Sequence, residues 1–275
     1  MMLWEQGKFR LDDPVSKYIP EFKNPVVLDS LLADGSYTTT PADKEISIRH
    51  LLTHTSGIGY GVIDGDDRFK KIYDKAGIID LFTTKNISIA ENTKKLAILP
   101  LHHNPGEKFT YSESYDVLGY FIEIISGMPF DKFLRTHIFN PLGMDDTWFY
   151  LPDSKADRLV SVQKKEDGKW ENYPITFYDT NYPINGAKKF FSGGAGLSST
   201  AEDYAKFLQM YLNQGVYNGK RLLSRTTVNI ILANQINDLW GENPNVLYGL
   251  AFAIQSRKGG EKGESGSEGT FSWGG

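Results

Sequence analysis

Apolar residues recur at helical spacing through the middle of this chain. In "YSESYDVLGYFIEIISG" they stand three and four positions apart, which predicts an amphipathic helix that ends at Gly127. The following segment, "PFDKFLRTHIFNPLG", repeats this pattern. The positions expected to face the core in these two helices are Val117, Leu118, Phe121, Ile122, Ile125, Phe130, Phe133, Leu134 and Ile138.

Capping residues predict three further helices. Ser47 precedes "IRHLLTHTSG", which Gly57 ends, and Ser224 precedes "RTTVNIILANQ". Thr200 and Asp203 form a start similar to a capping box for "AEDYAKFLQMYLNQG". These three N-caps define where each helix begins.

The remaining segments are less periodic. Residues 248–255, "YGLAFAIQ", alternate and predict a strand, and "TFSWGG" begins a second one after a flexible, glycine-rich connection. Residues 58–110 are expected to be rich in loops, with short amphipathic pieces around Ile78–Phe82, and residues 151–190 form an irregular excursion. The pattern therefore predicts one domain with a mostly helical middle and β-structure near its end.

The first residues resemble the end of a helix rather than its beginning. "MMLWE" precedes Gly7, a glycine typical of helix C-termini, and basic Lys8. Since a helix of so few residues does not form alone, we expect its earlier turns to lie upstream of Met1.

Composition narrows the classes of function. The net charge of −4 gives no basic surface for phosphates, so nucleic-acid binding is not expected. No cysteine is present, which excludes disulfides, thiol catalysis and cysteine-bound metals. No apolar run is long enough to span a bilayer.

Several motifs suggest chemistry but have simpler interpretations. His50 and His54 have the spacing of a helical zinc pair, yet Leu51 stands where a zinc protease needs glutamate, and capping or core-edge roles explain them better. "SGGAG" (192–196) lacks the lysine of a phosphate loop and predicts a tight turn or a close backbone approach. The one Ser-x-x-Lys, Ser161–Lys164, falls in a polar loop where no helix would join the two side chains.

Tyr111 is a stronger candidate. It stands in "PGEKFTYSESY", between a Pro-Gly turn and a predicted helix, where a hydroxyl can point into a cleft. An ordinary half-buried aromatic residue is the alternative if this motif is taken alone. The other motifs of the chain decide between them.

Five blocks occur in order: "LLTHTSG", "PGEKFTYSE", "GGAGLSSTAEDYAKFLQ", "YGLAFAIQ" and "FSWGG". Together with the opening "LWEQGKFRLDDPVSKYIPEF" they resemble the serine β-lactamase-like superfamily, specifically class C β-lactamases, family VIII carboxylesterases and DD-peptidases. The resemblance covers nearly the whole chain. It implies an α/β (α+β) fold in which helices flank an antiparallel sheet and a helical lobe is added.

The resemblance also implies how the chain is organised. Residues 1–275 would form one domain truncated at both ends, with a mostly helical lobe over about residues 21–190 and a return to the α/β lobe over about residues 191–275. The family's Ser-x-x-Lys nucleophile would lie upstream of Met1, and its third motif would continue beyond Gly275.

Site residues are implied by matching motifs. Tyr111 corresponds to the tyrosine that helps to move the proton, and Ser112 and Glu113 follow it in the substrate-binding motif. Trp273, Gly274 and Gly275 correspond to the third motif, which lines the cleft. The family's chemistry needs no metal and no cofactor, so none is expected.

The expected substrate is a small ester or amide. Glu113 replaces an asparagine and Trp273 a lysine, and both changes remove contacts to an anionic β-lactam, so esters are expected to be preferred. Without its nucleophile the chain is expected to be inactive as given. The alternative is a binding protein that keeps the fold without catalysis.

Overall fold

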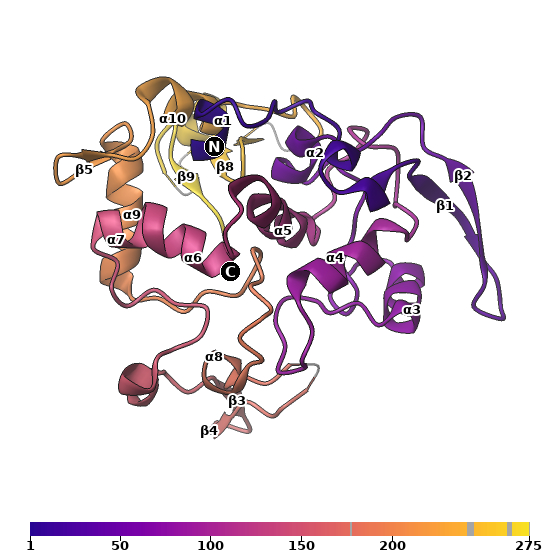
Figure 1. Ribbon diagram of the computed structural model, residues 1–275, viewed down its shortest axis with the longest axis horizontal. Helices are drawn as coiled ribbons and strands as arrows, with labels where there is room; N and C mark the ends of the chain where they lie inside the picture. Colours follow the sequence, from indigo (N-terminus) through magenta and orange to yellow (C-terminus); the bar gives the residue numbers. More distant parts are fainter. Residues whose placement is uncertain (177, 241–244, 263–265, 275) are drawn as a thin grey trace.

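The computed structural model describes residues 1–176, 178–240, 245–262 and 266–274. Helices dominate, and the strands form small antiparallel sheets (Figure 1). The helices are α1 (Met2–Glu5), α2 (Ile48–Leu52), α3 (Asp67–Ala76), α4 (Ile89–Ala97), α5 (Ser114–Ser126), α6 (Phe130–Leu134), α7 (Asn140–Leu142), α8 (Tyr182–Asn185), α9 (Ala201–Leu212), α10 (Arg225–Ile231) and α11 (Arg257–Glu261).

The strands pair mainly as hairpins. Three two-stranded sheets consist of β1 with β2, β3 with β4, and β5 with β6, whereas β7, β8 and β9 form one three-stranded sheet. Their bounds are β1 (Val26–Leu31), β2 (Tyr37–Pro41), β3 (Gln163–Glu166), β4 (Lys169–Asn172), β5 (Val216–Tyr217), β6 (Lys220–Arg221), β7 (Val246–Tyr248), β8 (Ala253–Gln255) and β9 (Phe271–Ser272).

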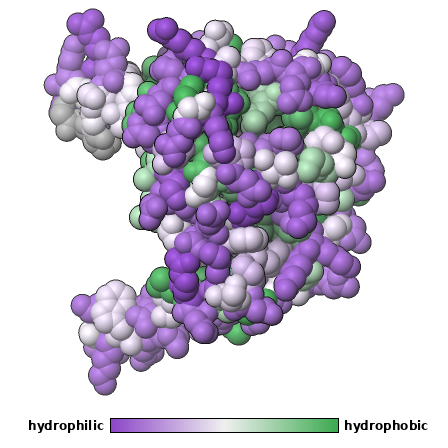
Figure 2. Space-filling view, turned by 60° about the vertical axis from the view of Figure 1, so that its left-hand side comes forward, coloured by the Kyte–Doolittle hydropathy of each residue, from purple (hydrophilic) through white to green (hydrophobic). Residues whose placement is uncertain are grey.

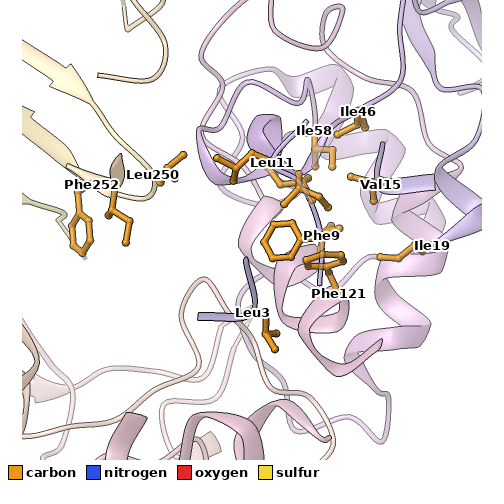
Figure 3. Close-up of a cluster of buried hydrophobic side chains, with 14 of the residues drawn as sticks. Leu3, Phe9, Leu11, Val15, Ile19, Ile46, Ile58, Phe121, Leu250 and Phe252 are labelled. Carbon is orange, nitrogen blue, oxygen red and sulfur yellow. The ribbon is translucent and has the colours of Figure 1, made fainter. Parts of the chain in front are cut away.

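Helix α5 lies at the centre of the molecule (Figure 1). Its Val117 and Phe121 are buried in the core, and the Phe121 ring makes edge contacts with Phe9 at 5.1 Å and Tyr18 at 5.0 Å between centroids. Figure 3 shows Phe9 directly beside Phe121 in this cluster. The predicted apolar stripe of this helix is therefore confirmed, and it anchors the N-terminal segment.

The N-terminal helix lies beside elements from the C-terminal part of the chain. Figure 1 places α1 beside α10 and the strands β8 and β9. The backbone N–H of Ser224, the N-cap of α10, donates a hydrogen bond of 2.7 Å to Glu5 at the end of α1. Gly7 has a φ of 69°, as expected of a residue that ends a helix.

The predicted N-caps at Ser47, Thr200 and Ser224 are confirmed. Each side chain accepts a hydrogen bond from the backbone N–H three residues on. At Ser47 a full capping box forms, in which the His50 side chain accepts a hydrogen bond of 3.1 Å from the backbone N–H of Ser47.

The loop-rich interpretation of residues 58–110 was wrong in part, because α3 and α4 lie there. Asp66 caps α3, which ends at a left-handed Gly77, and Ser88 with Glu91 forms a capping box for α4. The short pieces around Ile78–Phe82 are not helical. The capping signals were present in the sequence, but the many lysines of these helices concealed their narrow apolar stripes.

The single strand predicted over residues 248–255 is two strands, β7 and β8, joined by a tight turn. The turn residues are held from outside the hairpin: the Leu250 N–H donates to Ile231 at the end of α10, and the Ala251 N–H donates to Leu52 at the end of α2. Ala251 adopts a φ of 74°. Tertiary hydrogen bonds therefore override the local alternation.

Two further segments differ from the sequence-based expectation. The described part of residues 151–190 contains a 3-10 helix (Asp153–Arg158), the exposed hairpin β3–β4 and the short helix α8, joined by irregular segments. The connection before β9 begins with α11, which Ser256 caps. The second strand predicted in "TFSWGG" is confirmed as β9, which pairs with β8.

Hydrophilic side chains cover most of the face shown in Figure 2, and hydrophobic ones are exposed there in scattered patches. Over the described ranges no helix is both long and apolar enough to cross a membrane.

Asp203 fastens α9 to the loop that follows α7. Its buried carboxylate accepts hydrogen bonds from Asp146 N at 2.7 Å, Thr147 Oγ1 at 3.1 Å and Lys206 Nζ at 3.0 Å. The neighbouring Glu202 is exposed and contacts only Lys206, at 3.4 Å, among the described residues.

Asp203→Ala is expected to lower the free energy of unfolding by about 2–4 kcal/mol, since it leaves a buried N–H and a hydroxyl without their charged acceptor. Urea unfolding of the purified variant measures the change. Glu202→Ala is the matched control and should change stability by less than about 0.5 kcal/mol. Equal losses in the two variants would contradict this role of Asp203.

Candidate active site

The site is built where two of the sequence motifs run side by side. Four backbone hydrogen bonds join residues 54–59 to residues 102–113, and together they make "LLTHTSG" and "PGEKFTYSE" one unit. Tyr111 stands at the edge of this unit, shortly before α5. The four bonds are Thr110 N to His54 O, Gly106 N to Thr55 O and His102 N to Gly57 O at 2.7 Å each, and Glu113 N to Gly59 O at 3.1 Å.

Gly57 is required for this close pairing. Its φ is 83°, and a Cβ at this position would lie 2.4 Å from the carbonyl oxygen of His103. Any side chain would push the two segments apart. The glycine that was predicted to end the helix therefore brings the Tyr111 segment into place, while α2 itself ends earlier, at Leu52.

Tyr111 is the most exposed member of an aromatic cluster, at 39% of its surface. Its ring centroid lies 5.0 Å from Tyr60, 5.0 Å from His54 and 5.6 Å from Trp273. Burial, together with the neighbouring Tyr111, raises the pKa of the Tyr60 hydroxyl, so Tyr60 stays neutral. The half-buried ring and the exposed edge suit a residue that meets a ligand from solvent.

Trp273 reaches Tyr111 because β9 pairs with β8. In this register Phe271 lies opposite Ile254 and Ser272 opposite Ala253, so the chain that leaves β9 passes over the cluster. Trp273 also packs against Tyr248, at 5.4 Å. The structure thus brings together Tyr111 and Trp273, two predicted site residues far apart in the sequence.

The two glycines of the third motif are less informative. Gly274 is exposed beside Trp273, with open space where a Cβ would lie. Gly275 lies outside the described residues. Their expected contact with substrate stays a prediction.

Ser112 requires a correction, because it does not face the cleft. It is fully buried, and its hydroxyl lies 3.1 Å from His54 Nδ1 and 2.8 Å from Ser114 Oγ. Ser114 continues the chain to Ser56 Oγ at 2.9 Å. In an extended segment successive side chains point to opposite sides, so an exposed Tyr111 places Ser112 inside.

Glu113 requires a correction too. It is 1% exposed and lies against Asn92 of α4, whose Nδ2 donates to Glu113 Oε2 at 3.4 Å. Burial and the adjacent Asp80 raise the pKa of the Glu113 carboxyl well above its usual range. A buried, protonated carboxyl cannot repel an anionic substrate as the sequence suggested, so that part of the case for ester preference falls.

His54 belongs to this aromatic cluster, which the sequence analysis did not predict. It is fully buried among aromatic rings, with Tyr115 at 4.3 Å and Trp273 stacked at 6.0 Å, and its Nε2 has no partner among the described residues. Burial lowers its pKa to about 3, so the imidazole is neutral. His50 is a capping residue, which agrees with the simpler interpretation of this pair.

Among the described residues no three His, Cys, Asp or Glu side chains are grouped as metal ligands. The side chains of the site are mainly aromatic rings, hydroxyls and buried carboxyls. This set suits the positioning of an apolar group and the movement of a proton.

The glycine-rich "SGGAG" loop is confirmed as a close backbone approach. A Cβ on Gly193 would lie 2.2 Å from the carbonyl oxygen of Tyr115 in α5. The buried carboxylate of Asp116 accepts hydrogen bonds from Ser192 Oγ at 2.8 Å and Gly194 N at 3.0 Å, and burial raises its pKa to about 7. This loop is therefore fastened beside the start of α5.

Three aromatic residues, Tyr115, Tyr248 and Trp240, complete the cluster. Tyr115 and Tyr248 share a hydrogen bond of 2.7 Å between their hydroxyls, which joins α5 to β7. Trp240 stacks on Tyr248 at 4.9 Å and meets Trp273 at 6.0 Å. Only the tertiary fold brings these residues together, although the high aromatic content of the chain is visible in its composition.

Ser161 and Lys164 take no part in the cleft. Lys164 lies on β3 and pairs with Glu166 of the same exposed strand. Figure 1 shows the β3–β4 hairpin at the lower edge of the molecule, away from β9, the strand that precedes Trp273. The interpretation of this match as a chance occurrence is confirmed.

Comparison with known proteins identifies relatives of this chain. The chain is 31% identical to Protein Rv1367c of Mycobacterium tuberculosis, over 86% of this chain and 56% of that protein. It is also 31% identical to Esterase EstB of Burkholderia gladioli, over 76% of this chain and 52% of that protein. The chain thus spans about half the length of these curated relatives.

A solved structure gives the same result for the fold. EstCE1, described as a hydrolase with promiscuous acyltransferase activity, superposes with a TM-score of 0.71 at 26% identity, over 92% of this chain and 65% of that chain. The sequence model described as Beta-lactamase matches residues 1–275. The mixture of helices and small antiparallel sheets is accordingly the β-lactamase and penicillin-binding-protein fold, and the chain belongs to the beta-lactamase family.

Proposed function

We propose that this chain contributes the catalytic tyrosine and an aromatic wall to the active site of a serine hydrolase. The enzyme works through an acyl-enzyme intermediate and prefers esters. The observation that carries the proposal is the meeting of Tyr111 and Trp273 in one partly exposed cluster, at 5.6 Å between ring centroids. The similarity to an esterase and to a hydrolase with acyltransferase activity supports it.

Tyr111 is the proposed proton carrier. Its exposure lets its hydroxyl reach a substrate, and the buried rings of Tyr60 and His54 fix its plane. A tyrosine so placed can relay a proton, because its oxygen can accept the proton of an attacking serine hydroxyl as it donates its own proton to the leaving group. Ser112 and Glu113 support the backbone from inside and do not touch substrate.

The nucleophile is the missing part of this site. The one Ser-x-x-Lys of the printed sequence ends on β3, outside the cleft, and a tyrosine alone forms no acyl-enzyme. The proposal therefore assigns the nucleophile to a Ser-x-x-Lys of a longer chain. The 275 residues by themselves are proposed to be inactive.

The substrate preference rests on Trp273. Its ring, with Trp240 and Tyr248, offers an apolar wall for an acyl or aryl group. It stands where related lactamases have a lysine that would attract a carboxylate. The site is therefore proposed to accept small neutral esters better than anionic β-lactams.

A fluorophosphonate probe is expected to leave the 275-residue chain unlabelled. The reason is that the lysine of its one Ser-x-x-Lys, Lys164, pairs with Glu166 on β3 and activates no serine beside Tyr111. Intact-mass spectrometry measures this, with an activated ester tested for a burst of product. A covalent adduct on a cleft serine would contradict the proposal.

In a longer chain that includes the Ser-x-x-Lys, Tyr111→Phe is expected to lower kcat for ester hydrolysis about 10²–10⁴-fold with KM nearly unchanged, since only proton transfer is lost. Steady-state kinetics with p-nitrophenyl butyrate measure this. Tyr204→Phe, at an exposed tyrosine of α9, is the control. Full activity of the Tyr111 variant would refute its proposed part in proton transfer, whereas a longer chain without any esterase activity would favour the binding-protein alternative for this fold.

The same longer chain is expected to hydrolyse p-nitrophenyl butyrate with a higher kcat/KM than nitrocefin. Trp273→Lys should narrow this difference by about tenfold, because it adds a cation that can pair with the β-lactam carboxylate. Equal turnover of ester and nitrocefin by the unmodified protein would argue against the proposed preference.

A further inference from the structure

Two buried carboxyl groups lie behind Tyr111. Glu113 follows it by two residues, and Asp80 comes from the loop after α3, at 7% exposure. Two ionised carboxylates in adjacent buried positions repel each other strongly, so such a pair retains a proton.

Hydrogen-bond roles place this proton on Glu113. Both oxygens of Asp80 accept backbone hydrogen bonds, from Gly61 N at 3.0 Å and from Val62 N, so Asp80 is fixed as an acceptor. Glu113 Oε1 has no N–H or O–H donor within the described residues, and the Asp80 carboxyl is its close neighbour. A protonated Glu113 that donates to Asp80 leaves neither group unsatisfied.

We propose that Glu113 is a positioning residue for Tyr111: its proton, shared with Asp80, latches the 59–62 loop against the Tyr111 segment. The loop carries Tyr60, whose ring contacts Tyr111 at 5.0 Å. It is held at one end by Glu113 N–H on Gly59 O and at the other by Asp80. The catalytic role of Tyr111 rests on the proposed function. The hydrogen bond between Glu113 and Asp80, which we call the latch, does not depend on that function.

The surroundings oppose ionisation of Glu113. The titratable groups that face it are acidic: Tyr60 of the loop, Tyr73 of α3, Asp80 and Asp116. From α4 it meets the neutral Asn92. Asp64 also faces Tyr73, but it pairs with His102 at 3.0 Å.

A cavity reaches the Asp80 side of the pair. It has a volume of about 360 Å³, Asp80 lies in its wall, and lysines line it as well. The main lining residues are Gly61, Val62, Lys70, Lys71, Tyr73 and Asp80.

The latch predicts a definite pH dependence. Because the folded chain holds the Glu113 proton more tightly than the unfolded chain, its contribution to stability is complete below the ordinary carboxyl pKa. It is lost as pH rises through the folded pKa. Glu113→Gln replaces the O–H donor by an amide N–H donor that does not titrate, so it should keep the latch closed at every pH.

The test is the urea unfolding midpoint between about pH 5 and pH 9. The control is Glu171→Gln, at an exposed glutamate of β4. As pH rises, the urea midpoint should fall more steeply in the unmodified chain and in this control than in the Glu113→Gln chain. Asp116 titrates in all three chains, so the difference between their slopes isolates Glu113. Parallel slopes, or a Glu113→Gln chain that is less stable at every pH, would overturn the latch.

A second readout follows Tyr111 itself. Tetranitromethane nitration, mapped by peptide mass spectrometry, gives the rate at Tyr111 relative to exposed Tyr204 in the same sample. This ratio should rise several-fold at alkaline pH in the unmodified chain and stay level in Glu113→Gln. A ratio that does not change with pH, or that changes equally in both chains, would refute the coupling. Neither readout needs turnover, so an inactive Tyr111 site and a failed latch are distinguishable.

Discussion

The backbone pairing between residues 54–59 and residues 102–113 is the constraint on which the site depends. It fixes Tyr111 at the edge of the core and makes its neighbour Ser112 face inward. It requires glycine at position 57, because the carbonyl oxygen of His103 occupies the space of a Cβ. Helix α5, at the centre of the fold, begins directly after this pairing. The same backbone hydrogen bonds therefore position both the start of this helix and the candidate site.

Around this pairing, the polar groups of the site differ in how deeply they are buried. Tyr111 and Trp273 lie at the surface of the cluster, and His54, Glu113 and Asp116 are buried behind them. Burial lowers the pKa of His54, so its imidazole is neutral. It raises the pKa of the Glu113 and Asp116 carboxyls. The neutral His54 and the protonated Glu113 stiffen the aromatic wall without placing charge in it. Such a wall is suited to an uncharged substrate.

The sequence predicted the parts of the fold that local signals determine. Ser47, Thr200 and Ser224 cap helices as expected, and the apolar stripe of α5 is buried. The division of residues 248–255 into two strands was missed, because hydrogen bonds from distant helix ends impose the turn. Motif matching predicted Tyr111 and Trp273 as site residues, and the structure shows that they lie together. Only the packed structure shows that Ser112 and Glu113 face inward and that His54 joins the cluster.

Amide hydrogen exchange tests the central constraint most directly. The backbone amides of His102, Gly106, Thr110 and Glu113 should exchange only through global unfolding, at rates as slow as the core amides of α5, because each donates to the 54–59 segment. Exchange of these amides by local opening, far faster than that of α5, would contradict the account, since Tyr111 would then belong to a mobile loop.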